Sequence, residues 1–290
     1  MLDFAVAETL PPSLLRLGQA LHYLNHLDTV EGWLSPTTAL AMVETLWLQE
    51  RVGVIGDIAE IGVFQGKSFL ALAAGSRPAE RLVAVDIFDA GDPNAERPDQ
   101  DVYAYGEGNR AAFLANVAKF FPGVHPVILE GSSASLRGKE GAHGLTNLRM
   151  ISIDGSHTSA MTYNDLQIAD AALGPDGICW LDDVLNPHWM GVISGLFLFL
   201  GQAASLVPLA MFPNKLVLCR PAWIQYYRAA LRKLLGAGLA KERVELHQTE
   251  IDVFGESWPQ LRARCPFFNQ HLLERQVSKI DLGRADDTSS

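Results

Sequence analysis

The feature that most constrains the fold is a rhythm of short apolar segments that begins at Asp57. Each segment ends in a turn, and most end on a polar or acidic residue: DIAEIG, RLVAVD, HPVILEG, LRMISIDG and GICWLDD. Segments with a helical pattern, such as KSFLALAAG and TYNDLQIADAAL, lie between them. Strands that alternate with helices predict a parallel sheet with helices on both faces.

The two ends of the chain extend this pattern. Ser35 before Pro36 predicts the start of a helix that continues through TTALAMVETLWLQERV. After a helix near 191–202, the strands SLVPLAMF and LVLCR are joined by the short turn PNK, which predicts an antiparallel hairpin. An amphipathic helix, WIQYYRAALRKLLGAGL, and one strand, RVELHQTEIDVF, are expected to follow.

We therefore predict an α/β fold with a doubly wound sheet that is mostly parallel and has an antiparallel last strand. The expected divisions are an N-terminal helical region at 1–50, a central domain at 51–220, a helix and strand extension at 221–282, and a disordered tail at 283–290. The long acidic loop from Asp89 to Gly108 is expected to act as a lid.

Composition excludes several classes of protein. The chain has 33 acidic and 23 basic residues and a net charge of -10, whereas a nucleic-acid binder needs a basic surface. A hydrophobic content of 48% allows a large core. The 3 cysteines form no CxxC pair, and the N-terminus has no basic segment typical of a secretory signal, so a cytoplasmic location is expected. No charged side chain lies between Asp183 and Lys215, but glycines and prolines interrupt that stretch, so no membrane span is expected.

The turn after the first strand, EIGVFQGKS, has three interpretations. Gly66-Lys67-Ser68 resembles the end of a P-loop, but the spacing from Gly62 is one residue too short. A dinucleotide site would need a second glycine where Phe64 stands. The third interpretation uses two acids at strand ends, Glu60 for a cationic group and Asp86 for ribose hydroxyls. Together these acids indicate an adenosyl ligand with a charged amino-acid tail, which is S-adenosylmethionine.

Three further carboxylates follow the fourth and fifth strands. Asp154 ends one strand, and Asp182 and Asp183 end the next. Adjacent parallel strands lie about 4.8 Å apart, so these side chains are expected to meet. Strand-terminal aspartates can also cap helices, but three at neighbouring tips favour a cation site that suits Mg²⁺, Mn²⁺ or Ca²⁺. His157 lies three residues beyond Asp154 on the same edge.

The motifs EIGVFQGKS, VDIFD, IDGSHT and LDDVLNPHW together resemble the class I S-adenosylmethionine-dependent methyltransferases. Within this class the chain resembles the metal-dependent sugar O-methyltransferases of the macrocin and mycinamicin type, and the resemblance covers about residues 50 to 220. The resemblance implies a Rossmann-like sheet in which the central domain binds S-adenosylmethionine. It also implies a small hydroxylated substrate, such as a sugar, a glycosylated natural product or a catechol-like compound, and allows a homo-oligomer.

The resemblance also implies roles for individual residues. It assigns the cofactor to Glu60, Gly62, Gly66, Ser68, Asp86, Ser132 and Ser133; Mg²⁺ or Mn²⁺ to Asp154, Asp182 and Asp183; and catalysis to Asp154 and His157 as the base. The expected reaction is O-methylation. A hydrolase-like or hydroxylase-like relative, a P-loop-like phosphotransferase and a non-catalytic scaffold remain alternatives.

Overall fold

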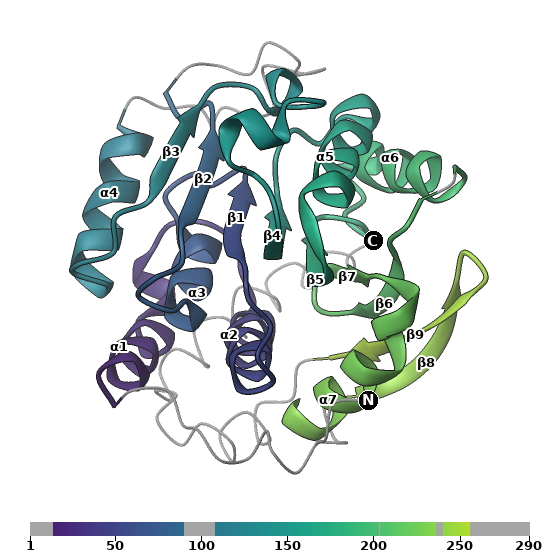
Figure 1. The fold of residues 1–290 in the computed structure, drawn as a ribbon, viewed down its shortest axis with the longest axis horizontal. Helices are drawn as coiled ribbons and strands as arrows, with labels where there is room; N and C mark the ends of the chain where they lie inside the picture. The colour runs from purple at the N-terminus through teal and green to yellow at the C-terminus, as the bar shows by residue number, and fades with distance from the viewer. Residues whose placement is uncertain (1–13, 90–107, 203, 236–239, 256–290) are drawn as a thin grey trace, which may run out of the picture.

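The computed structural model describes residues 14–89, 108–202, 204–235 and 240–255, and in this part of the chain one nine-stranded sheet forms the centre (Figure 1). The strand order is β3-β2-β1-β4-β5-β7-β6-β9-β8. The strands are β1 (Asp57–Ile61), β2 (Leu82–Asp86), β3 (Val127–Glu130), β4 (Leu148–Ile153), β5 (Leu173–Leu181), β6 (Val207–Met211), β7 (Leu216–Cys219), β8 (Ala240–Leu246) and β9 (Thr249–Phe254). Strands β1 to β5 pair in parallel, which confirms the predicted α/β fold.

Helices cover both faces of the sheet and enclose two separate cores. The helices are α1 (Leu14–Asn25), α2 (Pro36–Arg51), α3 (Lys67–Gly75), α4 (Asn109–Phe120), α5 (Ser159–Ala172), α6 (Met190–Leu200) and α7 (Ile224–Leu235), with short 3-10 turns η2 (Leu27–Thr29), η3 (Ser133–Ser135), η4 (Glu140–His143) and η5 (Pro221–Trp223). Residues of α1, α2, α3, α4 and α7 share one core, and residues of α5 and α6 belong to the other. Figure 1 shows α5 and α6 side by side, away from α1, α2 and α3.

The predicted start of α2 is confirmed. The Ser35 hydroxyl accepts a hydrogen bond from the Thr38 N–H at 3.0 Å, with Pro36 in the first turn. The Thr38 hydroxyl donates to the Pro213 carbonyl at 3.1 Å, in the turn between β6 and β7. The N-terminal end of α2 is therefore held against the turn between β6 and β7.

The hairpin of β6 and β7 is also confirmed, because β7 pairs antiparallel with both β5 and β6. The prediction of a single strand near the C-terminal end is wrong, because that segment forms a second hairpin, β8 and β9. His247 and Gln248 make its two-residue turn with φ values of 48° and 63°. Strand β9 pairs in parallel with β6, so the C-terminal extension continues the same sheet.

Two sequence predictions lie outside the described residues: the lid, apart from its ends Asp89 and Gly108, and the disordered tail. Cys179 and Cys219 are buried and unpaired. None of the helices in the described ranges combines the length and the apolar composition needed to cross a bilayer.

The middle strands end together at one edge of the sheet. The Asp154 N–H donates to the Ile61 carbonyl at 2.7 Å, and the Asp182 N–H donates to the Ile153 carbonyl at 2.9 Å. The residues that follow β1, β4 and β5 are therefore in register. Ligands of open parallel sheets bind at this carboxyl edge.

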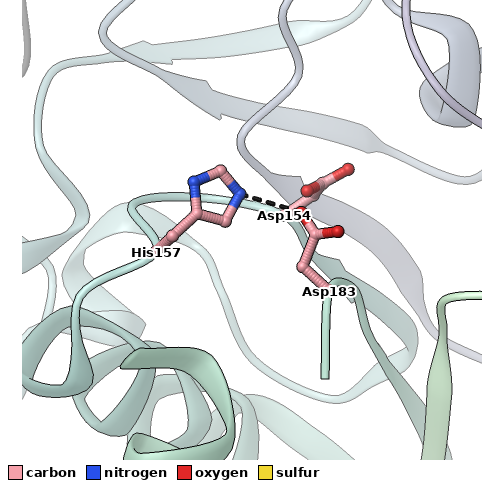
Figure 2. Close-up of side chains that lie close together, drawn as sticks. All are labelled: Asp154, His157 and Asp183. Carbon is pink, nitrogen blue, oxygen red and sulfur yellow. Dashed lines mark ion pairs between the residues drawn. The ribbon is translucent and has the colours of Figure 1, made fainter. Parts of the chain in front are cut away.

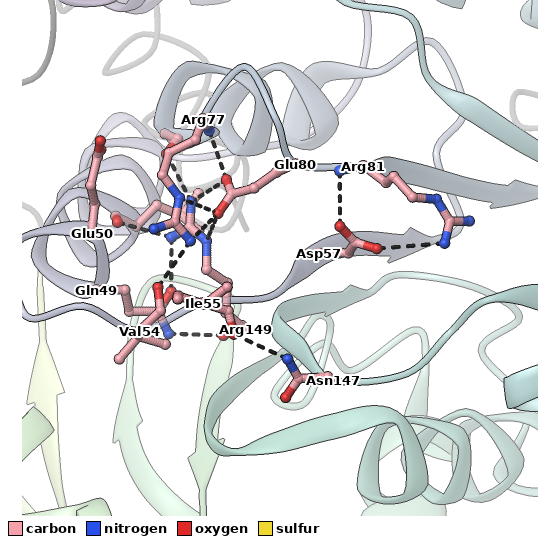
Figure 3. Close-up of polar contacts among 12 residues, drawn as sticks. Gln49, Glu50, Val54, Ile55, Asp57, Arg77, Glu80, Arg81, Asn147 and Arg149 are labelled. Carbon is pink, nitrogen blue, oxygen red and sulfur yellow. Dashed lines mark hydrogen bonds and ion pairs between the residues drawn. The ribbon is translucent and has the colours of Figure 1, made fainter.

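The opposite edge is held by Arg149, a fully buried arginine on β4 (Figure 3). Its guanidinium donates to both Glu80 oxygens at 2.7 Å, and also to the Leu46 and Gly75 carbonyls at 2.9 and 3.1 Å. Gln49 on α2 accepts from the same group at 3.1 Å. This side chain therefore joins α2, the end of α3 and β4 below the site.

Replacing Glu80 by alanine is expected to lower the free energy of unfolding by about 3 to 5 kcal/mol, because it leaves the Arg149 charge buried without its carboxylate. Urea denaturation would measure the change. Glu250→Ala is the matched control, since Glu250 pairs with Arg243 at an exposed position and should cost less than about 1 kcal/mol. Equal losses in the two variants would contradict the role given to Arg149.

Candidate methyl-transfer site

A cavity opens at the carboxyl edge between the first, second and fourth strands. It is lined by Ile61, Gly62, Phe64, Val85, Asp86, Ile87, Gly131, Ser132, Ser133, Asp154, Gly155, Ser156, His157 and Met161. Six of these are among the residues that the sequence assigned to cofactor, metal or catalysis: Gly62, Asp86, Ser132, Ser133, Asp154 and His157. The structure therefore brings the two predicted groups of site residues into one cavity, which we call the cofactor cavity.

Asp86, at the end of β2, is the carboxylate of the cofactor cavity that organises the glycine turn. One of its oxygens accepts from the Val63 N–H and from the Phe64 N–H, the latter at 2.8 Å. The other oxygen accepts from the Phe88 N–H. Burial raises the pKa of Asp86, and these backbone donors oppose the increase. The second oxygen accepts only this one N–H among the described contacts, and Asp86 lines the cavity, so the carboxylate can also accept from a ligand hydroxyl.

The glycine turn depends on a close approach of two backbones. Gly62 has a φ of +81°, and a side chain there would collide with the Asp154 carbonyl on the neighbouring strand. Phe64 also has a positive φ, of 50°, which is rare for an aromatic residue. The two hydrogen bonds to Asp86 and a stacking contact with Trp33 hold Phe64 in this conformation.

Ser132 and Ser133 form the wall beyond β3. The Ser133 hydroxyl donates to the buried Asp165 carboxylate at 2.6 Å, which ties this wall to α5. Ser132 accepts from the Ala134 N–H at 3.3 Å and so begins η3. The wall is therefore fixed by its own contacts.

Three predicted cofactor residues, Glu60, Gly66 and Ser68, do not line the cavity. Gly66, with a φ of +92°, lies against the Phe113 ring and begins α3. Glu60 is fully buried on the face that carries Ser68 and Lys215. Burial raises the pKa of Glu60 to about 7, while the Lys215 ammonium opposes the increase. Contacts of these three residues with a cofactor stay predictions.

Asp154, His157 and Asp183 lie together at the strand tips (Figure 2). One ligand atom from each lies within 4.8 Å of the others. The His157 Nε2 atom is 3.0 Å from an Asp183 oxygen, and the Trp189 ring stacks on the imidazole at 4.3 Å between centroids. Figure 2 shows the second imidazole nitrogen directed away from both carboxylates.

Asp183 is held as a carboxylate by its neighbours. Its Oδ1 atom accepts from the Asn186 and Asn214 amides at 2.9 and 2.7 Å, and Oδ2 faces His157. Burial alone would raise the pKa of Asp183, but these contacts outweigh it and lower the pKa to about 2. The group therefore stays ionised throughout the neutral range.

Asp182 differs from its neighbours because its oxygens are already occupied. The buried Lys215 ammonium donates to Oδ2 at 2.6 Å, and the Asn214 amide and the Asp183 N–H each donate to Oδ1 at 2.8 Å. Lys215 also lies 3.5 Å from Asp154. Burial would lower the pKa of Lys215, but the surrounding carboxylates raise it, so the ammonium stays charged.

The donor set at the strand tips is compatible with a divalent ion. His157 Nε2 is buried and has no aligned hydrogen-bond partner although an Asp183 oxygen lies 3.0 Å away, so this oxygen stays open to an ion. Asp154 is a second carboxylate on the same side, and burial raises its pKa. Two carboxylates with open positions for water suit Mg²⁺.

Sequence reasoning missed Lys215, Asn214 and Asn186. Lys215 lies in the turn between β6 and β7, and Asn214 beside it has a φ of 69°. The sequence did contain one signal for Lys215. Asp183 and Lys215 are the charged residues at the two ends of a stretch that contains no charged side chain. The structure brings the two ends of that stretch together.

This chain resembles known methyltransferases in part of its sequence and in its fold. Residues 59–184 match the family described as a methyltransferase domain. The crystal structure of the calicheamicin methyltransferase CalS11 aligns with a TM-score of 0.50 and 20% identity, over 74% of this chain and 96% of that one. An O-methyltransferase from Bacillus cereus, in complex with SAH, has 16% identity over 74% and 94% of the chains, with a TM-score of 0.47. TomG from Streptomyces achromogenes, an O-methyltransferase in complex with SAM, has 15% identity over 74% and 92%, with a TM-score of 0.46. Comparison with curated protein sequences found no match.

The chain shares its fold with the methyltransferase CalS11. Residues 59–184, which match the family described as a methyltransferase domain, make up less than half of the chain. That segment begins in β1 and ends just after β5, so it contains the glycine turn and all the strand tips described above.

The raised pKa of Glu60 generates a prediction about stability and pH. Because this carboxyl keeps its proton to about pH 7 in the folded chain but loses it near pH 4.5 when unfolded, it lowers stability as the pH rises through that interval. Glu60→Gln removes this effect. Both proteins are denatured with urea at pH 5 and pH 8. The free energy of unfolding of the variant, relative to that of the wild type, should be on the order of 3 kcal/mol higher at pH 8 than at pH 5. A difference that does not change with pH would contradict the assignment.

Proposed function

We propose that this methyltransferase transfers the methyl group of S-adenosylmethionine to a hydroxyl oxygen of a small molecule, with the help of a divalent ion. The observation that carries the proposal is the convergence of Asp86 and the Asp154, His157 and Asp183 cluster at one carboxyl edge. The similarity of fold to CalS11, a calicheamicin methyltransferase, supports methyl transfer as the reaction.

The cofactor cavity can hold an adenosyl group between two fixed walls. On one side, Asp86 accepts from the ribose hydroxyls while it holds the glycine turn. On the other side, Ser132 and Ser133 close the cavity next to the adenine. When bound, S-adenosylmethionine supplies the methyl group as a sulfonium, whose positive charge disappears on transfer.

The cation site is proposed at Asp154 and Asp183, with Mg²⁺ or Mn²⁺ as the ion. When bound, the ion supplies Lewis acidity that lowers the pKa of the reacting hydroxyl. Asp183 presents Oδ2 to the site because Asn186 and Asn214 fix its other oxygen. Asp182, the third ligand that the sequence predicts, already has its oxygens on Lys215 and Asn214, which favours a supporting role.

His157 is proposed as the base. Its Nε2 atom, buried beside the carboxylates without an aligned hydrogen-bond partner, takes the hydroxyl proton, and the ionised Asp183 at 3.0 Å stabilises the imidazolium that forms. Trp189 stacks on the ring and limits its rotation. These contacts orient the base before the acceptor binds. Proton removal by such a base typically increases the reaction rate by roughly 10²- to 10⁴-fold.

Cofactor binding tests the first part of the proposal. Calorimetric titration with S-adenosylhomocysteine should show a site that Asp86→Ala weakens at least about tenfold, because the variant loses both the ribose acceptor and the contacts that hold Val63 and Phe64. Glu130→Ala is the control, since Glu130 is exposed at the tip of the next strand outside the cavity lining. No heat with millimolar ligand would contradict the proposed cofactor.

Metal binding tests the second part. Electron paramagnetic resonance of Mn²⁺ titrated into the protein should reveal a site that is lost in Asp154→Asn and in Asp183→Asn. Asp182→Asn should keep the site, because Asp182 is directed to Lys215. Equal loss in all three variants would support the three-carboxylate site predicted from the sequence, and unchanged binding in Asp154→Asn would contradict both ligand sets.

A further inference from the structure

The outermost strand of the sheet, β8, has a free edge. The strand order ends at β8, which pairs with β9 alone among the described strands, and Figure 1 shows this hairpin at the outer side of the molecule. Residues 242–245 of β8 are exposed. The hairpin lies outside residues 59–184, which match the methyltransferase domain. Unpaired N–H and C=O groups on such an edge can bind another strand.

The turn of the hairpin determines which residues of β8 face the free edge. Both turn residues have positive φ, 48° and 63°, as in a two-residue type I′ turn. Such a turn is closed by a hydrogen-bonded pair, here Leu246 and Thr249. Hydrogen-bonded and non-hydrogen-bonded pairs alternate along an antiparallel ladder. The backbone N–H and C=O groups of Arg243 and Glu245 therefore point away from β9, toward the free edge.

The side chains of these two residues carry opposite charges on one face of the sheet. Glu245 lies directly opposite Glu250 on β9, and like charges at opposed positions destabilise a sheet. Arg243 contacts Asp252 at 3.2 Å and Glu250 at 3.4 Å. Its guanidinium has five N–H groups, which is more than these two contacts use. An added strand could therefore place a cation beside Glu245 and a carboxylate beside Arg243.

A second copy of β8 meets both requirements in one register. Two identical antiparallel strands pair about a twofold axis, with their outward backbone groups facing each other. An axis at Arg243 would oppose two arginines, and an axis at Glu245 would oppose two glutamates. An axis at Val244 places Arg243 of each copy opposite Glu245 of the other. The charge pattern of β8 is therefore complementary to itself when the pairing is centred on Val244.

Exposed apolar side chains border the same edge. Val244, on the other face of the strand, is exposed and would lie opposite Val244 of the second copy. Phe197 and Leu198 of α6 are 41% and 55% exposed. The Phe197 ring lies 6.0 Å from the His247 ring at the hairpin tip, and the start of the second copy's β8 would lie beside this tip. Pairing can therefore bury apolar surface on one face and form ion pairs on the other.

We propose that two copies of this chain associate through β8, antiparallel and centred on Val244, so that the two sheets become continuous across a twofold axis. The occupant of the free edge is a second copy because β8 itself supplies both charges in this register. An interface of one strand pair is small, so we expect a dissociation constant on the order of tens of micromolar. The inference does not rest on the proposed function, because it uses no residue of the cofactor cavity.

Sedimentation velocity of the full chain, from micromolar to near-millimolar concentration, tests the proposal. The wild type should change from a monomer of 31.6 kDa to a dimer as its concentration rises. Glu245→Arg should raise the dissociation constant at least about tenfold, because two Arg–Glu pairs become pairs of like charge. Glu130→Arg is the matched control, since it makes the same change in charge on β3, the other edge of the sheet, and should stay within about threefold of the wild type. A wild type that remains monomeric throughout, or equal effects of the two variants, would overturn the proposal.

A proline variant separates backbone pairing from charge. Glu245→Pro removes an N–H that faces solvent in the monomer, a position at which edge strands accept proline. The variant should keep the circular dichroism spectrum of the wild type and lose the dimer. A dimer that persists in Glu245→Pro would have its contact elsewhere, which would overturn the proposal.

Disulfide cross-linking tests the register. The background is Cys265→Ser, in which the two remaining cysteines are buried. On oxidation, Val244→Cys should give a cross-linked dimer, because a non-hydrogen-bonded pair brings its Cα atoms to about 4.5 Å. Glu245→Cys should cross-link at least about tenfold more slowly, since its two copies would be diagonal neighbours about 7 to 8 Å apart. Equal cross-linking at the two positions would contradict the pairing centred on Val244.

Discussion

One buried ammonium group organises the carboxyl edge of the sheet. Lys215 is 1% exposed and lies between Asp182 and Asp154, with Glu60 also acting on its charge. Buried charges persist only when they are paired, so β7 must stay in register with β5 and β4 for this lysine to be stable. The pairing has a chemical consequence, because it engages Asp182 and leaves Asp154 and Asp183 to face His157.

The fold could be predicted in most of its parts because it follows from local patterns. Alternating apolar segments and helices gave the parallel sheet, and the short turn before Lys215 gave the antiparallel hairpin. The second hairpin was missed because His247 and Gln248 both adopt positive φ, a conformation usually marked by glycine or asparagine. Long-range pairing of β9 with β6 also has no local signature.

From the sequence, the site could be predicted only for those residues whose positions follow from where the strands end. Asp154, Asp183 and His157 meet because the ends of β4 and β5 are in register. Asp182 and Glu60 were harder to interpret, since strand alternation turns both toward the face that carries Lys215, which the sequence could not place there. The stretch between Asp183 and Lys215 contains no charged side chain. At its two ends, the Asn214 amide donates to Asp183 and the Lys215 ammonium donates to Asp182.

Two cavities lie at this edge of the sheet: the cofactor cavity, which Phe64 and Asp154 line, and a second cavity, which Trp33 and Lys215 line. The oxygen and the methyl group must approach in line, so the acceptor and the donor need separate walls that cannot move independently. Asp86 fixes the backbone of Phe64, and the Phe64 ring supports Trp33. On the other side, Asp154 and Lys215 connect the same two cavities through an ion pair. An aromatic contact and a charged contact thus fix the distance between the cavities, so the interactions that stabilise this edge of the sheet also set the geometry on which the proposed chemistry depends.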